Sequence, residues 1–379
     1  MKTSIKLLVL IFSAILLIAL GIRLFLYQNQ RLFEKDDSQE SDTENELSED
    51  VTVIADNLSI PWDIAFLPTG EMLVTERDGN LFVFNGSEER MKVEDVEHVG
   101  EGGLLGMALH PDFSSNRFVY LYQTSRSESG IINHVVRYTF KDNTLSDSRT
   151  IIDNIPGVAT HDGGRLRFGP DGYLYITTGD AENARLSQDP NSLVGKILRL
   201  TDNGRIPADN PFGNAVWSLG HQNPQGITWD DKGNMWATEH GPSGFDEINL
   251  IFAGGNYGWP AWKANQPNET DAPIFGDEVI MPISSSGSDR SQTWAPASAL
   301  YLDGSIFFGG LAGNALYEAV LDGEKVLEIK EHFKGEFGRI RSVVLGPDNM
   351  IYISTSNRDG RGRPETDDDK VIKINPYTF

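Results

Sequence analysis

Residues 160–180 have the sequence THDGGRLRFGPDGYLYITTGD, and this stretch decides the fold. Leu166 and Phe168 alternate with arginines, and the aromatic and β-branched run Tyr173–Thr178 follows a Pro-Asp-Gly turn. Alternation of apolar and polar residues on both sides of such a turn is typical of two paired strands. We therefore expect a β-hairpin here.

The hairpin carries a histidine and an aspartate that its strand pattern does not require. His161 precedes the first strand and Asp180 follows the second, so the hairpin brings the two residues side by side. A carboxylate beside an imidazole fixes the tautomer of the ring and raises its basicity. The pair is a candidate acid–base site, and the alternative is a loop histidine beside a turn-capping aspartate.

The same phrase of strand, turn and strand recurs along the chain. Six copies are present, with starts near residues 64, 107, 165, 227, 299 and 343. Starts spaced by about 45 to 70 residues suit four-stranded blades joined by loops of unequal length. The chain is therefore predicted to be all-β, with residues 51–379 forming a six-bladed β-propeller. A two-sheet sandwich would not explain a repeated phrase of this kind.

Radial repeats leave a central channel whose mouth is lined by loops from different blades. Several loops that follow the second strand of a repeat are polar and rich in glycine, among them residues 179–183 and 239–244. These segments are expected to meet at one end of the channel. Residues 263–290, in contrast, are expected to form a polar insertion poor in strands.

Composition limits the partners and the chemistry. The 379 residues include 32 Lys and Arg against 55 Asp and Glu, which gives a formal net charge of -23. Nucleic-acid binding needs a basic surface, so a nucleic-acid partner is not expected. The sequence contains no cysteine, which excludes disulfides, thiolate metal sites and a catalytic thiol and suits an exported protein.

The first 50 residues differ in character from the rest. Residues 1–30 contain an apolar run preceded by Lys2 and Lys6, and residues 31–50 are rich in acidic and hydroxyl side chains. The run is long enough to cross a bilayer, so we expect a signal anchor, the alternative being a signal peptide cleaved near residues 19–21. The two lysines favour an N-terminus inside and an extracytoplasmic propeller tethered to the cell membrane, or secreted if cleaved. The acidic segment is predicted to be a disordered linker.

Eight phrases occur in the same order in a known family. The sequence resembles the soluble quinoprotein glucose dehydrogenases and their relatives, the aldose sugar dehydrogenases that use pyrroloquinoline quinone (PQQ). The resemblance covers about residues 51–376, and the fold it implies is a six-bladed propeller, in agreement with the repeats. The phrases are Ile60–Trp62, Gly102–Ala108, His161–Leu166, Gly179–Asp180, Gly220–Gly226, Glu239–Ile251, Asn256–Pro260 and Gly338–Arg341.

The resemblance implies an activity and the roles of the histidine–aspartate pair. His161 would be the general base that takes the proton from the C1 hydroxyl of a sugar while hydride passes to the quinone. Asp180 would be the carboxylate that orients the base. The expected reaction oxidises aldose sugars to lactones, and the electrons then leave to an electron acceptor outside the membrane.

The resemblance also implies sites for the cofactor and for calcium. Backbone carbonyls of Gly241 and Pro242 match a segment that binds the Ca²⁺ ion beside the cofactor, and Glu247 and Tyr257 match a second, structural calcium site. Two arginines that lie two residues apart on a strand share one face, where their guanidinium groups suit a planar tricarboxylate. The predicted cofactor-binding residues are Gln222, Asn223, His240, Arg339 and Arg341.

Three positions depart from the family pattern, and each change makes the site less positive. Gln222 replaces an arginine, Glu101 replaces a neutral glutamine on the substrate side, and Ala312 replaces a cofactor-binding lysine of the glucose dehydrogenase branch. A cation near the quinone oxygens would stabilise the charge that develops there during reduction. The departures therefore bear on cofactor affinity and sugar specificity.

Two other functions remain open on the sequence, because a propeller fold alone does not decide between them. One is a non-catalytic propeller that binds a carbohydrate or a protein at the channel mouth. The other is a hydrolase or lactonase with calcium in the channel, for which a set of acidic and amide ligands is not apparent. Trp259, Trp262 and Trp294 are candidates either for stacking on a sugar ring or for core packing.

Overall fold

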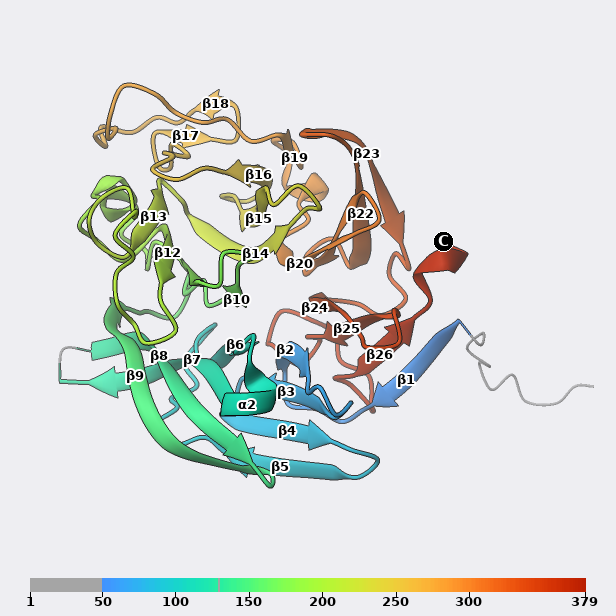
Figure 1. Cartoon of the computed structure of the whole chain (residues 1–379). Helices are drawn as coiled ribbons and strands as arrows, with labels where there is room; N and C mark the ends of the chain where they lie inside the picture. Colours follow the sequence, from blue (N-terminus) through green and yellow to red (C-terminus); the bar gives the residue numbers. More distant parts are fainter. Residues whose placement is uncertain (1–49, 129) are drawn as a thin grey trace, which may run out of the picture. The chain divides into compact units, whose positions relative to one another are not determined.

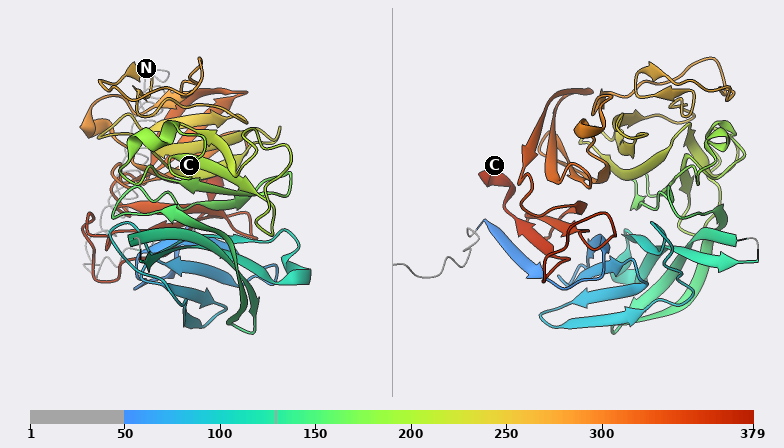
Figure 2. Two further views of the ribbon diagram at one scale, coloured as in Figure 1. Left: turned by 90° about the vertical axis from the view of Figure 1, so that its left-hand side faces the viewer. Right: turned by 180° about the vertical axis from the view of Figure 1, so that it is seen from behind.

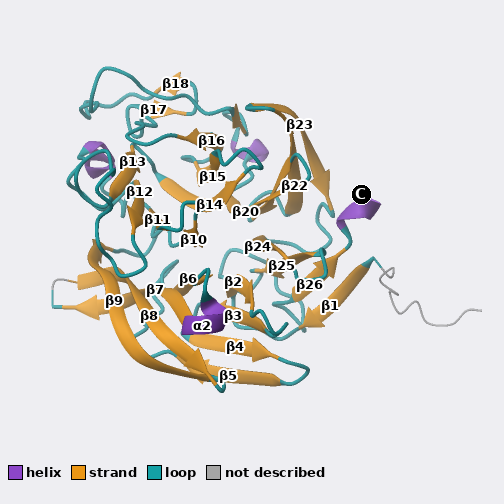
Figure 3. Cartoon of the chain, in the orientation of Figure 1, coloured by secondary structure: helices purple, strands orange, loops and turns teal. Residues whose placement is uncertain are grey.

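The computed structural model describes residues 50–128 and 130–379. They form six four-stranded antiparallel sheets around a central axis, so the predicted six-bladed β-propeller is confirmed (Figure 1). Within these ranges the helices are α2 (Phe113–Asn116) and three short 3₁₀ turns, as Figure 3 shows, and none of them is long and apolar enough to cross a membrane. The predicted anchor and residues 31–49 of the predicted linker lie outside the described residues.

Each blade begins with the strand nearest the axis and proceeds outward. Blade 1 contains β2 (Pro61–Phe66), β3 (Met72–Glu76), β4 (Asn80–Phe84) and β5 (Glu88–Lys92). Blade 2 contains β6 (Leu104–Leu109), β7 (Phe118–Ser127), β8 (Gly130–Lys141) and β9 (Thr144–Pro156). Blade 3 contains β10 (Leu166–Phe168), β11 (Leu174–Thr178), β12 (Lys196–Leu200) and β13 (Val216–Leu219).

The second half of the ring repeats this arrangement. Blade 4 contains β14 (Asn223–Trp229), β15 (Met235–His240), β16 (Glu247–Ile251) and β19 (Ser284–Ser285). Blade 5 contains β20 (Pro296–Leu302), β21 (Ser305–Gly310), β22 (Ala315–Asp322) and β23 (Lys325–His332). Blade 6 contains β24 (Ile340–Leu345), β25 (Ile351–Thr355), β26 (Val371–Ile374) and β1 (Val51–Ala55).

The ring is closed by pairing of the two ends of the propeller. Strand β1 runs antiparallel to β26, with Val51 opposite Ile374, and so forms the outer strand of the last blade. The backbone N–H of Asn375 also donates to the carbonyl of Asp50 at 2.8 Å. The view from behind in Figure 2 shows β1 beside the C-terminal strands. Nothing in the local sequence of either strand indicates this pairing.

The insertion between β16 and β20 was expected to be poor in strands, and it contains three strands of two residues each. It contains a small hairpin, β17 (Trp262–Lys263) and β18 (Gln266–Pro267), and it also supplies β19. Strand β19 is only two residues long and pairs Ser285 with Glu247. The outer edge of blade 4 is therefore formed by a short strand from the insertion, which the polar sequence did not indicate.

Six apolar clusters hold the ring together, one between each pair of neighbouring blades. Between blades 2 and 3, for example, Tyr122 packs in one cluster with Ile176 and Leu198, all with no exposed surface. Full burial of such a side chain contributes roughly 1.5–3 kcal/mol. The alternation seen in the sequence thus directs one face of each strand toward the next blade.

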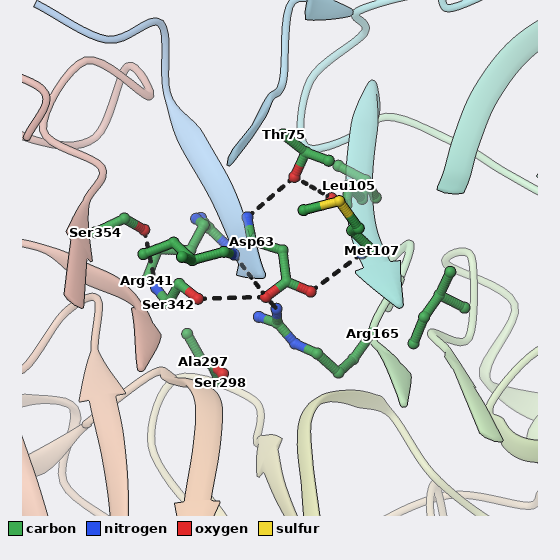
Figure 4. A network of polar contacts seen from close by, with 12 residues as sticks. Asp63, Thr75, Leu105, Met107, Arg165, Ala297, Ser298, Arg341, Ser342 and Ser354 are labelled. Atoms are coloured by element: carbon green, nitrogen blue, oxygen red, sulfur yellow. Dashed lines mark hydrogen bonds and ion pairs between the residues drawn. The ribbon is translucent and has the colours of Figure 1, made fainter. Parts of the chain in front are cut away.

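A buried carboxylate joins four blades at the centre of the ring (Figure 4). Asp63 of β2 lies 2.7 Å from Nη1 of Arg165 and 2.8 Å from Nη1 of Arg167, both in blade 3. It also accepts hydrogen bonds from the N–H of Met107 in blade 2 at 3.1 Å and from the hydroxyl of Ser342 in blade 6 at 3.3 Å. Burial alone would raise the pKa of Asp63, but the two guanidinium charges outweigh it and lower the pKa to about 2.

Replacing Asp63 by asparagine should destabilise the propeller by about 3–5 kcal/mol, because Arg165 would keep a buried charge without a partner. Since the folded pKa of Asp63 is lowered, its stabilising effect is present above about pH 4 and is lost as the pH falls toward 2. Denaturant unfolding at several pH values should therefore show the stabilities of D63N and the unmodified chain converging on acidification.

The matched control is Glu97→Gln, which removes the exposed ion pair with Arg126 and should change stability little. If D63N and this control have equal effects, Asp63 does not hold the blades together.

Candidate active site

Two cavities of about 410 and 280 Å³ adjoin at one end of the channel. The larger is lined by Arg339 and Arg341 and is called the arginine cavity; the smaller is lined by His161 and is called the base cavity. Their shared lining comes from segments all around the ring, so the expected meeting of loops at one end is confirmed. The residues that line both cavities are Glu101, Thr160, His240, Ala295, Ala312 and Arg361.

The backbone of His161 is held in an unusual conformation by its neighbours. Its φ angle of 60° lies in the left-handed region, which costs energy for a residue with a side chain. The carboxylate of Glu101 accepts its N–H at 3.0 Å, and the N–H of Ala181 donates to its carbonyl at 3.3 Å. A Cβ at Gly179 would stand 1.8 Å from that carbonyl oxygen, so only glycine allows the two ends of the hairpin to approach.

The predicted proximity of His161 and Asp180 is confirmed, with Nδ1 and Oδ1 2.8 Å apart. The histidine side chain is 30% exposed, whereas that of Asp180 is 2% exposed. The aspartate also accepts the N–H of Glu182 at 3.0 Å and the indole N–H of Trp259 at 2.9 Å. Trp259, which the sequence offered as a sugar-stacking or core residue, thus fixes the carboxylate that orients the histidine.

The charges around His161 make its ring a stronger base. Burial lowers the pKa of His161, but the hydrogen bond and charge of Asp180, with the charges of Glu101 and Glu182, outweigh burial and raise it. Because Nδ1 is bonded to Asp180, Nε2 is the nitrogen available to a ligand in the base cavity.

Glu101, predicted on the substrate side, lines both cavities and also holds the base in place. One carboxylate oxygen accepts the His161 N–H, and the other lies 2.6 Å from Nη1 of Arg361. Burial raises the pKa of Glu101, but the charge of Arg361, the hydrogen bond from the His161 N–H and the charge of Arg341 outweigh it and lower the pKa. Glu101 is therefore a charged residue that connects His161 to Arg361.

The two predicted arginines both contact Asp359 and line the arginine cavity; Arg341 lies on β24 as expected, whereas Arg339 directly precedes that strand. Arg339 donates from Nε and Nη2 to Asp359 at 3.0 and 2.8 Å, and Nη2 of Arg341 lies 3.7 Å from the same carboxylate. Arg341 also donates to the side chain of Gln225 at 3.1 Å. Burial and the charge of Arg77 lower the pKa of Arg341 to about 9. Both guanidinium groups are thus held on the wall of the arginine cavity.

Three other predicted cofactor residues carry buried polar atoms that lack hydrogen-bond partners. Oε1 of Gln222, Nδ2 of Asn223 and Nε2 of His240 have no partner in the described structure. The side-chain oxygen of Asn223 accepts the N–H of Gly163 at 3.0 Å, which fixes the amide. Burial lowers the pKa of His240 to about 4, so this ring is neutral near pH 7. Unsatisfied buried groups cost about 1–3 kcal/mol each, and a polar ligand would remove that cost.

The predicted calcium segment forms a tight turn after β15. The N–H of Gly241 donates to Asp246 at 3.1 Å, and Pro242 follows directly. A Cβ at Gly241 would stand 2.3 and 2.4 Å from the carbonyl oxygens of Phe245 and Gly244, so the turn packs backbone oxygens closely. Gly241 lines the base cavity.

The second predicted calcium site lies beside a pair of carboxylates. Glu247 on β16 stands opposite Glu239 on β15, and burial together with the charge of Glu239 raises the pKa of Glu247 to about 8. The hydroxyl of Tyr257 donates to the carbonyl of Leu250 at 2.7 Å. Within the described ranges no three His, Asp or Glu side chains are grouped to hold a metal ion. A cation there would need backbone oxygens as well as Glu247.

The model of the family described as Glucose / Sorbosone dehydrogenase matches residues 58–363. The aldose sugar dehydrogenase YliI of Escherichia coli (strain K12) is 34% identical over 86% of this chain and 92% of that protein. Quinoprotein glucose dehydrogenase B of Acinetobacter calcoaceticus is 34% identical over 56% of this chain and 52% of that protein. The PQQ-bound aldose sugar dehydrogenase of Streptomyces coelicolor matches with a TM-score of 0.78 and 35% identity, over 86% of this chain and 97% of that one.

Replacing Asp180 by asparagine should lower the pKa of His161, because the largest influences raising it are the hydrogen bond and charge of that carboxylate. NMR titration of the ring protons, assigned with a His161→Gln variant, measures this shift. Glu182→Gln, which removes a weaker and more distant charge, is the control and should lower the pKa less. An unchanged pKa in D180N would contradict the assigned role of Asp180.

Proposed function

The chain belongs to the glucose/sorbosone dehydrogenase family and is, by that membership, a PQQ-dependent sugar dehydrogenase; we propose that it oxidises aldoses at C1 to lactones with His161 as general base. The observation that carries the proposal is the pairing of His161 with Asp180 at 2.8 Å, beside a cavity walled by arginines. A sugar in the base cavity would present its C1 hydroxyl to the ring.

The hydrogen bonds around His161 suit proton removal. With Nδ1–H donating to Asp180, Nε2 carries a lone pair that accepts the C1 hydroxyl proton as the C1 hydride leaves and the C1–O double bond forms. Asp180 then stabilises the imidazolium. The bound quinone supplies the acceptor for the hydride. Removing the proton as the hydride leaves avoids a build-up of positive charge on the sugar.

The residues present fit a planar, anionic cofactor. Arg339 and Arg341 would hold its carboxylates, and the unpartnered Nε2 of His240, which lines both cavities, offers a further polar contact, whereas the unpartnered atoms of Gln222 and Asn223 lie outside the lining of both cavities. The neutral Gln222 gives less stabilisation to a reduced quinone than an arginine would. The same donor set is less suited to the hydrolase alternative, which needs acidic and amide side chains around a channel calcium.

We also propose calcium at the two predicted positions. Backbone carbonyls of Gly241 and Pro242 would hold one ion beside the cofactor, and Glu247 with the backbone of Tyr257 would hold a second. All these donors are oxygens, which Ca²⁺ prefers. Glu239, opposite Glu247, pairs with His221 at 2.7 Å, and a cation at Glu247 would offset the burial and the repulsion from Glu239 that raise the pKa of Glu247, which supports the second position.

The proposed location is extracytoplasmic, with residues 1–30 tethering the propeller to the cell membrane and residues 31–50 acting as a spacer. The apolar run, the two preceding lysines and the absence of cysteine support it. Electrons would then leave to an acceptor on that side of the membrane.

The decisive experiment titrates the full chain with PQQ in excess Ca²⁺ and follows the cofactor absorbance, then its reduction by a panel of aldoses. We expect saturable binding and sugar-dependent reduction. His161→Ala should keep the binding and lose at least about 100-fold in reduction rate. The control His134→Ala, in β8 and outside both cavities, should keep both.

Failure of the unmodified chain to bind micromolar cofactor would refute the proposal. It would favour the alternative of a non-catalytic propeller that binds a carbohydrate or a protein at the channel mouth.

Removal of calcium gives an independent measurement. Adding Ca²⁺ to chelator-treated protein should raise the thermal unfolding midpoint, because a cation bound only by the folded state stabilises it. Glu247→Gln should lose part of this rise, whereas Glu331→Gln, on the outer strand of blade 5, should retain it. A full calcium response in E247Q would exclude Glu247 as a ligand.

A further inference from the structure

Arg77 is a buried arginine of blade 1 whose backbone is held from both sides. It directly follows β3 and is 3% exposed. Its N–H donates to the carbonyl of Ile60 at 3.2 Å, and its own carbonyl accepts the N–H of Leu104 at 3.1 Å. A Cβ at Gly103 would stand 2.0 Å from the Arg77 carbonyl oxygen and 2.8 Å from its Cγ, so the segment before β6 packs directly on this residue. The start of the side chain is therefore fixed where it enters the arginine cavity.

Among the described residues, the guanidinium group of Arg77 has few hydrogen-bond partners. Its Nε has none, and its Nη2 reaches only the backbone oxygen of Asp359, at 3.5 Å. In contrast, Arg339 uses Nε, Nη1 and Nη2 in hydrogen bonds to Asp359 and to the carbonyl of Leu311. Nearby carboxylates are thus occupied by other arginines, and Arg77 forms no ion pair with a described residue.

Positive charge exceeds negative charge around the arginine cavity. The guanidinium groups that line it are those of Arg77, Arg339, Arg341 and Arg361, and the carboxylates are those of Glu101, Asp162 and Asp359. Burial raises the pKa of Asp162 to about 7, so this carboxyl is partly neutral near physiological pH. Burial also lowers the pKa of Arg77, and the charges of Asp359 and Glu101, which are shared with other arginines, offset this only in part. A buried charge without a counter-charge is costly unless an anion accompanies it.

We propose that Arg77 binds a carboxylate of pyrroloquinoline quinone in the arginine cavity, as a third guanidinium beside Arg339 and Arg341. The inference rests on the proposed function. Arg77 of blade 1 would then supply positive charge to the site, where Gln222 and Ala312 stand in place of an arginine and a lysine of the family. Arg77 is then a cofactor-binding residue. Its guanidinium group forms no ion pair with a described residue in the free protein and gains one when PQQ binds.

The test compares Arg77→Met with the unmodified full chain in two measurements: the dissociation constant for PQQ in excess Ca²⁺, and the unfolding midpoint without cofactor. Loss of a charge-assisted hydrogen bond should raise the dissociation constant about 10- to 100-fold. The midpoint without cofactor should stay the same or rise, because the variant no longer buries an unpaired charge. Arg77→Lys, which keeps the charge but not the planar fork, should bind with intermediate affinity.

Arg126→Met is the matched control, since this arginine is exposed and pairs with Glu97 outside both cavities. It should leave the dissociation constant unchanged. An unchanged dissociation constant in R77M would overturn this inference and leave the proposed function standing. A lower midpoint together with weaker binding would assign Arg77 a structural role and also overturn it. Failure of the unmodified chain to bind PQQ would overturn both.

Discussion

The carboxylate of Asp63 is the contact on which the geometry of the propeller depends. Apolar clusters between blades supply most of the adhesion, but such contacts are not directional and leave the angle between blades free. Charge-assisted hydrogen bonds have defined directions, and Asp63 forms them with blades 2, 3 and 6 at once. One buried charge therefore sets the positions of four of the blades around the axis.

The same network forms the floor of the candidate site. Arg165, which pairs with Asp63, donates from Nε to the carbonyl of Gln225 at 2.9 Å and lies over the ring of Trp62 at 4.1 Å. The side chain of Gln225 in turn accepts from Arg341 at 3.1 Å. Trp62, Gln225 and Arg341 all line the arginine cavity. Its wall is therefore rigidly connected to the centre of the fold, which places the polar groups before any ligand arrives.

Local sequence was sufficient to predict the blades and the His161–Asp180 pair, because strand alternation, turn residues and hairpin geometry all act over a few residues. It was not sufficient where partners are distant. Nothing in Val51–Ala55 specifies a C-terminal partner strand, and Trp259 is 79 residues from the aspartate it contacts. The sequence does not distinguish Arg77 from other loop residues, because its burial and its lack of an ion pair with a described residue depend on blades that are distant in the chain.

The pKa values of the two histidines at the channel mouth are shifted in opposite directions by their surroundings. His161 faces three carboxylates, which raise its pKa despite burial. His240 lines both cavities, and burial lowers its pKa to about 4 although the charges of Asp246 and Glu101 act to raise it. Near neutral pH only His161 is basic enough to take up a proton, whereas His240 can only offer a neutral ring to a ligand. Glu101 and Arg361, 2.6 Å apart, line both cavities. Because the carboxylates beside His161 raise its pKa, the ring remains a base next to a cavity whose arginines suit an anion.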